Sequence, residues 1–321
     1  MRLWGVSMVR NEEDIVEAFV RHNLTVLDGM IVVDHGSADR TLAILNALCA
    51  ERLRLVVLRS DAVGYLQAEI TTTAARDAFA RGGADAVFPL DADEFLRVAS
   101  REALERELAA FPPGHHGRVA WPTFVPPLDG TARDIVASLR ASRRVRPAID
   151  APPDLACKIV LTQSFASDPA ATVTMGNHGV ILGRHQVNSP RMPHVELPAD
   201  VVEICHVPVR SAVQFVVKTT IKRLARIAAG RDYAPGGMIR LAFDAIRDGA
   251  PLTAARMLAT HVGAVVPEAS GASGPAEPPF VAPIALRYTP AVPADPLPLV
   301  VSAVEQLARR AAATPAARAG S

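Results

Sequence analysis

Two aspartates, two positions apart, have the clearest potential for chemistry in this sequence. Asp91 and Asp93 follow the apolar run 87–90 directly. A short apolar run bounded by polar residues is typical of a buried strand, and side chains two apart on a strand project from one face. Two such carboxylates repel unless a cation lies between them, and hard oxygen ligands suit Mg2+ or Mn2+. The stretch predicts a metal–diphosphate site, with an acidic turn closing a strand as the alternative.

Three other side chains are candidates to act with this pair. Glu94 comes next, but adjacent strand residues face opposite ways, so a surface acid or a salt-bridge partner is the competing interpretation. His206 ends the apolar segment 201–207, and imidazole is a good ligand for Mn2+; a histidine capping a strand end is the alternative. His178 lies in a polar segment typical of a hairpin turn. If that hairpin overhangs the site, His178 can orient an acceptor or act as a base.

The first hundred residues alternate apolar and helical patterns, which predicts a largely parallel sheet with helices packed on it. Right-handed crossovers bring the carboxyl ends of such strands to one rim, where Ser7, Asp34 and Asp91 lie. Asn11 is expected to cap the first helix. The expected strands cover 3–9, 30–34, 53–58 and 85–91.

The pattern changes after the helix that Ser100 is expected to cap. Apolar segments are then separated by stretches rich in Pro, Gly and Arg, which favours antiparallel pairing. No regular pattern is visible from 267 to 298, which reads as linker or irregular surface. The expected later strands cover 119–125, 156–161, 171–175 and 201–207, and the expected helices cover 211–229, 238–247, 252–262 and 300–313.

Composition excludes several classes of protein. The 321 residues are 50% hydrophobic and 5% aromatic with a net charge of +1, which argues against nucleic-acid binding. Three cysteines without CxxC spacing suggest neither a disulfide framework nor a zinc site and fit a reducing cytoplasm. No signal peptide and no transmembrane segment of about 20 apolar residues is visible. Peripheral membrane contact stays open.

The order of three motifs resembles the nucleotide-sugar-binding half of family 2 glycosyltransferases. The motifs are the Arg-Asn-Glu exit of the first strand, 10–12, the Asp-x-Gly-Ser-x-Asp-x-Thr turn, 34–41, and the Asp-x-Asp of 91–93. The resemblance covers residues 1 to about 100. It implies a GT-A fold: a Rossmann-like, mostly parallel α/β sheet with helices on both faces, a smaller mixed or antiparallel acceptor region and C-terminal helices. The implied division is 1–111 for the donor, 112–230 for the acceptor side and 231–321 as an extension.

The resemblance also implies roles for individual side chains. Asp34 would read the base or ribose of the donor, with capping of the following turn as its alternative. Asp91 would contact the ribose or a metal-bound water, and Asp93 would bind Mn2+ or Mg2+, with His206 as a late third ligand. Further donor-binding candidates are Ser7, Arg10, Asn11, Glu12, Arg210 and Lys218. Glu12 is equally a helix-start acid, and cations on an amphipathic helix are often solvated.

The catalytic base does not follow from the resemblance, because the family's Glu-Asp pair and Gln-x-x-Arg-Trp motif are missing from 101–321. The candidates are Glu203, His178, Glu94, Glu196 and Asp154. The expected function is metal-dependent transfer of a sugar, with inversion, from a UDP, GDP or dTDP donor to a hydroxyl of a glycan, lipid-linked or small-molecule acceptor. A nucleotidyltransferase acting on a sugar phosphate and a non-catalytic binding module are the alternatives.

Overall fold

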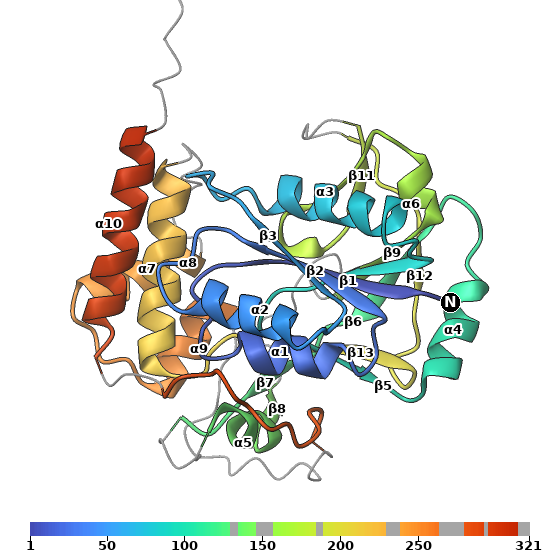
Figure 1. Cartoon of the computed structure of the whole chain (residues 1–321). Coiled ribbons are helices and arrows are strands. Elements are labelled where there is room, and N and C mark those ends of the chain that lie inside the picture. The colour runs from blue at the N-terminus through green and yellow to red at the C-terminus, as the bar shows by residue number, and fades with distance from the viewer. Residues whose placement is uncertain are drawn as a thin grey trace, which may run out of the picture.

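One large mixed sheet runs through the molecule and joins the two halves of the chain (Figure 1). The computed structural model describes residues 1–128, 134–145, 157–183, 189–228, 238–262, 279–291 and 295–313. Within these ranges no helix is long and apolar enough to cross a membrane. The mixed α/β class expected from the sequence is confirmed.

The N-terminal part of the sheet is parallel, as predicted. Its strands are ordered β3-β2-β1-β4, and each neighbouring pair runs in the same direction. Their carboxyl ends therefore form one rim. The bounds are β1 Leu3–Val9, β2 Gly29–Asp34, β3 Leu55–Arg59 and β4 Ala86–Pro89.

Alternate residues of these strands pack into two cores, one on each face of the sheet. Val32 belongs to a core shared with Phe19 and Leu45, from the helices below the sheet in Figure 1. Ile31 and Val33 belong to a second core, with the alanines and Phe79 of the helix above the sheet. The near-continuous apolar runs follow from this double burial. The helices are α1 Val16–Asn23 and α2 Thr41–Ala50 below, and α3 Gln67–Ala80 above.

The C-terminal part of the sheet is mixed. The antiparallel pairing expected there is only partly found, because the strand in the segment 201–207 pairs antiparallel with one neighbour and parallel with two. The order continues β4-β9-β6-β13-β7-β8, while β12 pairs with β6 and β5 pairs with β13. A separate hairpin, β10–β11, closes through the 3-10 turn η2, Met175–Asn177. The strands are β5 Glu94–Val98, β6 His116–Ala120, β7 Thr123–Val125, β8 Arg143–Val145, β9 Cys157–Thr162, β10 Ala171–Val173, β11 Val180–Leu182, β12 His194–Glu196 and β13 Val202–His206.

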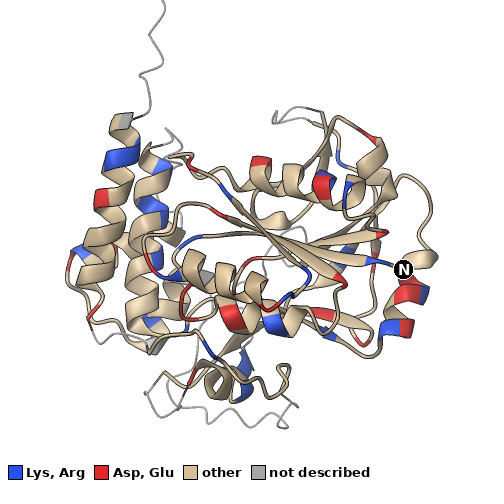
Figure 2. Cartoon of the chain, in the orientation of Figure 1, with Lys and Arg blue, Asp and Glu red and all other residues tan. Residues whose placement is uncertain are grey.

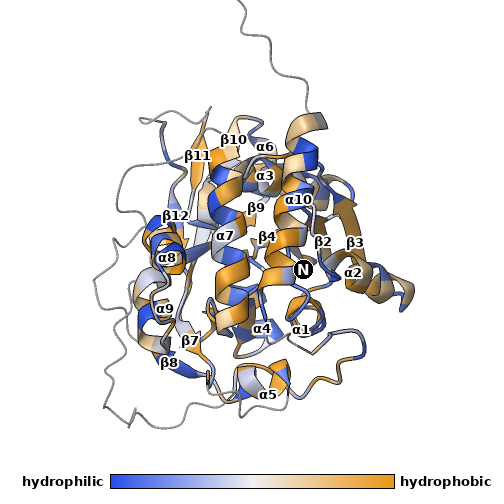
Figure 3. Cartoon of the chain, turned by 90° about the vertical axis from the view of Figure 1, so that its left-hand side faces the viewer, coloured by the Kyte–Doolittle hydropathy of each residue, from blue (hydrophilic) through white to orange (hydrophobic). Residues whose placement is uncertain are grey.

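Two long helices, α7 and α10, run beside each other at one side of the molecule (Figures 1 and 3). They share an apolar cluster in which Ala303 of α10 meets Val217 and Ile221 of α7. The predicted cap of α4 is confirmed, because Ser100 Oγ accepts from the amide of Ala103. The remaining helices are α4 Arg101–Ala109, α5 Ile135–Arg140, α6 Gln163–Ser167, α7 Ala212–Ala228, α8 Met238–Arg247, α9 Ala254–Val262 and α10 Leu297–Ala313.

Two local predictions are wrong. Asn11 does not cap α1, which begins at Val16 without a side-chain cap; its backbone is left-handed (φ 53°) and its side chain accepts from the amide of Ala38. The expected strand 85–91 ends at Pro89, because the chain turns to enter β5, which pairs antiparallel with β13. Asp91 and Asp93 therefore lie in a turn and not on one face of a strand.

Candidate functional site

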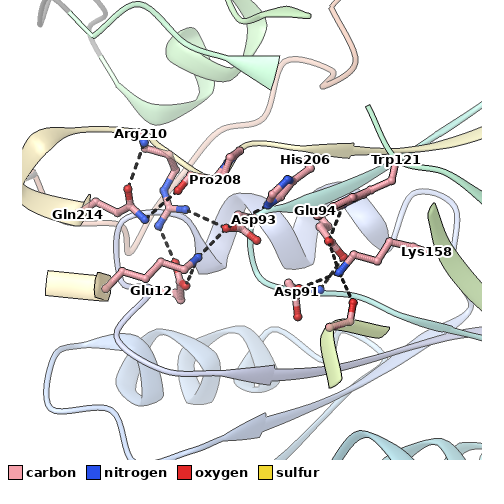
Figure 4. A network of polar contacts seen from close by, with 12 residues as sticks. Glu12, Asp91, Asp93, Glu94, Trp121, Lys158, His206, Pro208, Arg210 and Gln214 are labelled. Atoms are coloured by element: carbon pink, nitrogen blue, oxygen red, sulfur yellow. Dashed lines mark hydrogen bonds and ion pairs between the residues drawn. The ribbon is translucent and has the colours of Figure 1, made fainter. Parts of the chain in front are cut away.

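Asp93 lies at the centre of a buried ion-pair cluster at the rim of the sheet (Figure 4). Its Oδ2 accepts from Lys218 Nζ at 2.6 Å and lies 3.9 Å from Arg210 Nη1. Arg210 also binds Glu12 and Asp14, and Lys218 lies 3.0 Å from Glu12. Burial alone would raise the pKa of Asp93, but the surrounding cations outweigh it and hold that pKa below its ordinary value. Asp93 is thus a carboxylate in the folded protein.

Lys158 organises a second cluster around Asp91 and Glu94. Its Nζ, on the central strand β9, lies 2.9 Å from Asp91 Oδ2, 2.7 Å from Glu94 Oε1 and 2.7 Å from the carbonyl oxygen of Gly176. These three acceptors match the three donors of an ammonium. Gln67 donates to the other oxygen of Asp91 at 2.6 Å. The turn that carries Asp91 is thereby tied to β9, to α3 and to the β10–β11 hairpin.

Glu94 is a wholly buried salt-bridge partner and not a surface acid. Its side chain accepts from Trp121 Nε1 and from the amide of Asp91, both at 2.8 Å, as well as from Lys158. Burial, reinforced by the neighbouring aspartates, raises the pKa of Glu94 to about 8, although Lys158 opposes this shift. Lys158 and the two N–H donors keep that pKa from rising further.

Three rings line the edge of the two clusters. Trp121 stacks on His206 with ring centroids 4.3 Å apart and meets His178 edge-on at 5.3 Å. Burial lowers the pKa of His206 to about 3 and, together with the charge of Lys158, that of His178 to about 4, so both rings are neutral at pH 7. The Nδ1 of His178 lies 2.7 Å from the carbonyl oxygen of Cys157 and must donate to it, which leaves Nε2 as an acceptor.

Asp34 and the end of β1 form the opposite side of the rim. The carboxylate of Asp34 accepts from the amide of Ser37 at 3.2 Å, so the turn-capping interpretation holds for this state of the protein. Ser7 Oγ and all three guanidinium nitrogens of Arg10 are buried without a hydrogen-bond partner among the described residues. Burial and the nearby charge of Arg310 lower the pKa of Arg10 to about 10. Unsatisfied buried donors are costly, which marks a place for a polar ligand or water.

The C-terminal helix α10 closes over the turn that follows Asp34. Arg310 binds Asp61 at 3.0 Å, and Gln306 donates to the carbonyl oxygen of Ser37. Gly36 has φ 70°, and a Cβ there would lie 1.7 Å from Nη1 of Arg310, so any other residue would strain the backbone and displace this guanidinium. Helix α10 is therefore part of the rim.

The chain has distant structural similarity to several solved proteins. One is S. aureus TarS 1-349, at 13% identity, covering 76% of this chain and 70% of that one with a TM-score of 0.36. Another is the mannosyltransferase PcManGT from Pyrobaculum calidifontis in complex with GDP-Man and Mn2+, at 14% identity, 98% and 76% coverage and a TM-score of 0.35. A third is glucosyl-3-phosphoglycerate synthase from Mycobacterium tuberculosis in complex with Mn2+, UDP and glucosyl-3-phosphoglycerate. It is 16% identical, and the match covers 78% of this chain and 81% of that one with a TM-score of 0.32.

These likenesses are distant. No family model matches the chain, and no curated protein matches it either.

Asp93 and His206 are spaced to hold a divalent cation in place of Lys218, whose ammonium lies 2.6 Å from the same Asp93 oxygen. Asp93 Oδ2 and His206 Nε2 are 3.9 Å apart, and two ligands at about 2.1 Å from one ion can be up to about 4.2 Å apart. A neutral imidazole and a carboxylate suit Mn2+. Among the described residues no three His, Cys, Asp or Glu side chains form a ready ligand cluster. Asp91, which Lys158 holds, stays a prediction as a third ligand, and substrate oxygens and water would complete the shell.

The candidates for the catalytic base lie in different places. Glu203 points from the opposite face of β13 to His206, because the two residues are three apart on the strand. There its carboxylate is already paired with Arg97 and Arg144. Glu196, on β12, pairs with Arg118, away from the rim. Asp154 lies outside the described residues. His178 does overhang the rim, through the hairpin that binds Lys158 and Asp91.

A separate pocket lies between α7 and the first loop. Asn11, Asp14, Asp39, Val213 and Leu299 are among its lining residues, and its volume of about 30 Å³ holds one or two waters. Asp34, Asp91 and Asp93 do not line it.

Sequence reasoning missed Lys158, Trp121, Gln67, Tyr65 and Lys222. A strand residue such as Lys158 carries no motif, because its two carboxylate partners lie more than 60 residues away in sequence. One signal was available: the chain contains only three lysines among 34 Lys and Arg residues, and all three lie at this rim.

The buried histidines predict that the protein loses stability in mild acid. Burial lowers the pKa of His35, His116 and His178 to about 4 and that of His206 to about 3, against about 6.5 in an unfolded chain. Their contribution is complete above about pH 6.5 and is lost as the pH falls toward 4, because only the unfolded state takes up protons in that window. We expect the free energy of unfolding to fall by on the order of 5 kcal/mol from pH 7 to pH 5.

Urea titrations at half-unit pH steps measure this loss. His116→Gln removes one titrating group far from the acids of the rim. The unfolding free energy of this variant should therefore fall less steeply with decreasing pH than that of the parent protein, and the two slopes should differ by up to about 1.4 kcal/mol per pH unit. Equal slopes for the variant and the parent protein would contradict the assignment.

Proposed function

We propose that this protein is a glycosyltransferase of GT-A type. It would move a sugar, of the hexosyl class, from a UDP, GDP or dTDP donor to a hydroxyl group of a glycan, a lipid-linked molecule or a small acceptor. In this proposal residues 1–111 bind the donor, 112–230 carry the acceptor side and 231–321 form an extension. One observation supports the proposal most: Asp34 and Asp93 lie near the carboxyl ends of parallel strands, together with Lys158 and Lys218, which pair with acids there. Open α/β sheets bind ligands at this end of their strands.

In the proposed complex the two sides of the rim bind different parts of the donor. The carboxylate of Asp34 accepts from NH or OH groups of the nucleoside, and the unpartnered guanidinium of Arg10 donates to its oxygens. Ser7, Asn11 and Glu12 lie along the same end of β1. Arg210 and Lys218 face the diphosphate from α7 and the loop before it, and they can exchange part of their contact with Glu12 and Asp93 for phosphate oxygens.

We further propose His178 as the base of an inverting displacement. An acceptor hydroxyl must lose its proton as it attacks the anomeric carbon. Nε2 of His178 carries a lone pair because Nδ1 donates to Cys157, and Trp121 fixes the ring. Glu94 has no free oxygen for this step, and Glu203 faces two arginines. A divalent ion held by Asp93 and His206, with Asp91 beside it, supplies Lewis-acid charge for the departing diphosphate when bound.

A thermal-shift screen of UDP-, GDP- and dTDP-sugars, with and without Mn2+, tests the proposal. A ligand at 100 times its Kd stabilises the native state by about 2.7 kcal/mol, a rise in Tm of several degrees. Asp34→Asn should abolish the response, whereas Asp244→Asn, a surface substitution on α8, should keep it. The proposal fails if no nucleotide sugar shifts Tm. Turnover of nucleoside triphosphate with a sugar phosphate would instead identify a nucleotidyltransferase, and donor binding without turnover a binding module.

A further inference from the structure

All three lysines of the chain gather at one place. Lys158 comes from β9, and Lys218 and Lys222 lie one turn apart on α7; Figure 2 shows several basic residues along this helix. Every other basic side chain among the 34 is an arginine. An ammonium is a compact point charge, whereas a guanidinium is a planar fork, so the two are not interchangeable. Lysine at all three positions of this rim calls for a physical reason.

Two of these lysines have carboxylate partners and the third has none. Lys158 binds Asp91 and Glu94, and Lys218 binds Asp93 and Glu12. Lys222 makes neither a hydrogen bond nor an ion pair with any residue in the described part of the chain, and its ammonium lies 5.3 Å from the centre of the Tyr65 ring. The acids that would neutralise it are already taken by its two neighbours.

The surroundings of Lys222 are positive and partly dry. Burial, and then the charges of Lys218 and Arg226, lower the pKa of Lys222 to about 8. The guanidinium of Arg226 lies 5.7 Å from the centre of the same Tyr65 ring. Tyr65 in turn donates to Gln67, which binds Asp91. A half-buried ammonium beside two other cations costs stability unless an anion joins it.

We propose that Lys222, together with Arg226 over the ring of Tyr65, binds a phosphate group of one of the two substrates. This proposal rests on the proposed function, since it assigns a phosphate subsite at that same rim. Lys222 and Arg226, from successive turns of α7, would both contact the same phosphate oxygens, and both pack against the ring of Tyr65. The phosphate comes either from the donor diphosphate or from a phosphorylated acceptor. The competing explanation is a solvated lysine on a helix surface.

Calorimetric titration with inorganic pyrophosphate tests this subsite without requiring any glycosyl transfer. We expect Lys222→Gln to weaken pyrophosphate binding about tenfold and Lys222→Arg, which keeps the charge, to weaken it less than threefold. Arg240→Gln removes a cation from the surface of α8, where it pairs only with Asp244 among described residues, and is the matched control. Unchanged affinity in Lys222→Gln, or an equal loss in the control, would overturn the proposal. Thermal unfolding of each variant verifies the fold.

A second arm identifies the source of the phosphate. If the donor supplies it, Lys222→Gln weakens UDP, GDP or dTDP about tenfold and leaves the matching nucleosides unaffected. If the acceptor supplies it, pyrophosphate affinity still falls while nucleotide affinity does not change. Either result supports the subsite. A third outcome separates the two proposals. If pyrophosphate binding depends on Lys222 but the protein binds no nucleotide sugar, the proposed function is refuted and the anion site is still supported.

Discussion

Asp93→Asn is expected to reduce kcat/KM for sugar transfer by about 10²–10³-fold, or about 3–4 kcal/mol of transition-state stabilisation. Asn keeps the shape of the side chain and removes its charge. That charge is the point on which Lys218, Arg210 and His206 converge. Without it, the two cations turn to Glu12 and Asp14, and the proposed metal loses its carboxylate ligand.

Two measurements separate this effect from unfolding. The Tm of Asp93→Asn should stay close to that of the parent protein, because Lys218 and Arg210 keep their other carboxylate partners. Mn2+ titration in the presence of the nucleoside diphosphate should show weakened binding. Asp244→Asn is the matched control, since this acid pairs with arginines on the surface of α8. A folded Asp93→Asn protein with transfer within threefold of the control would refute the assignment of Asp93.

The sequence predicts the sheet well because each strand carries its own local signal. Residues 3–9 and 30–34 are apolar on both faces, since α3 packs on one side and α1 and α2 on the other. The turn at 34–41 and the acids at 91–93 are equally local, so the rim could be placed by topology alone. The order of the later strands could not, because β13 inserts between β6 and β7 through single residue pairings.

The partners of the rim acids could not be predicted, because they are set by packing across distant segments. Glu94 illustrates the limit. Strand alternation suggests that it faces away from Asp91, but the turn between them brings the amide of Asp91 back onto its carboxylate. Lys158 and Trp121 then bury it from β9 and from the loop before β7. Glu94, which the sequence suggests is a surface acid, is thus the most buried carboxylate of the site.

That enclosure makes Lys158→Met the substitution with the largest expected effect on stability. Lys158 is 1% exposed and holds two carboxylates and one carbonyl oxygen. Removing one partner of a buried ion pair leaves an uncompensated charge and typically costs about 3–5 kcal/mol. For a chain of this size we expect Tm to fall on the order of 10 °C. Lys222→Met is the matched control: it removes a lysine of the same rim that has no ion pair among the described residues, so its stability should stay equal to that of the parent protein or rise.

Removing Glu94 together with Lys158 should restore much of the lost stability. In Lys158→Met/Glu94→Gln the carboxamide oxygen can accept from Trp121 or from the amide of Asp91, and no buried charge remains at this position. A double-mutant cycle should give a coupling of about 1–3 kcal/mol between the two residues. A coupling near zero would mean that Lys158 stabilises the fold only through Asp91 and Gly176.

The pH dependence gives an independent test of the same contact. Burial already raises the pKa of Glu94 to about 8 in the parent protein. Loss of Lys158 raises it further, so the folded single variant keeps Glu94 protonated above pH 8 as well. A carboxyl group with a raised folded pKa costs stability as the pH rises above its unfolded value of about 4.3. The gap in unfolding free energy between Lys158→Met and the parent should therefore widen between about pH 8 and pH 10, where Glu94 ionises in the folded parent but not in the folded variant. Glu94→Gln should remove that widening, because the group that titrates is then absent, and a gap that is constant across this range would place the lost stability in packing and not in charge.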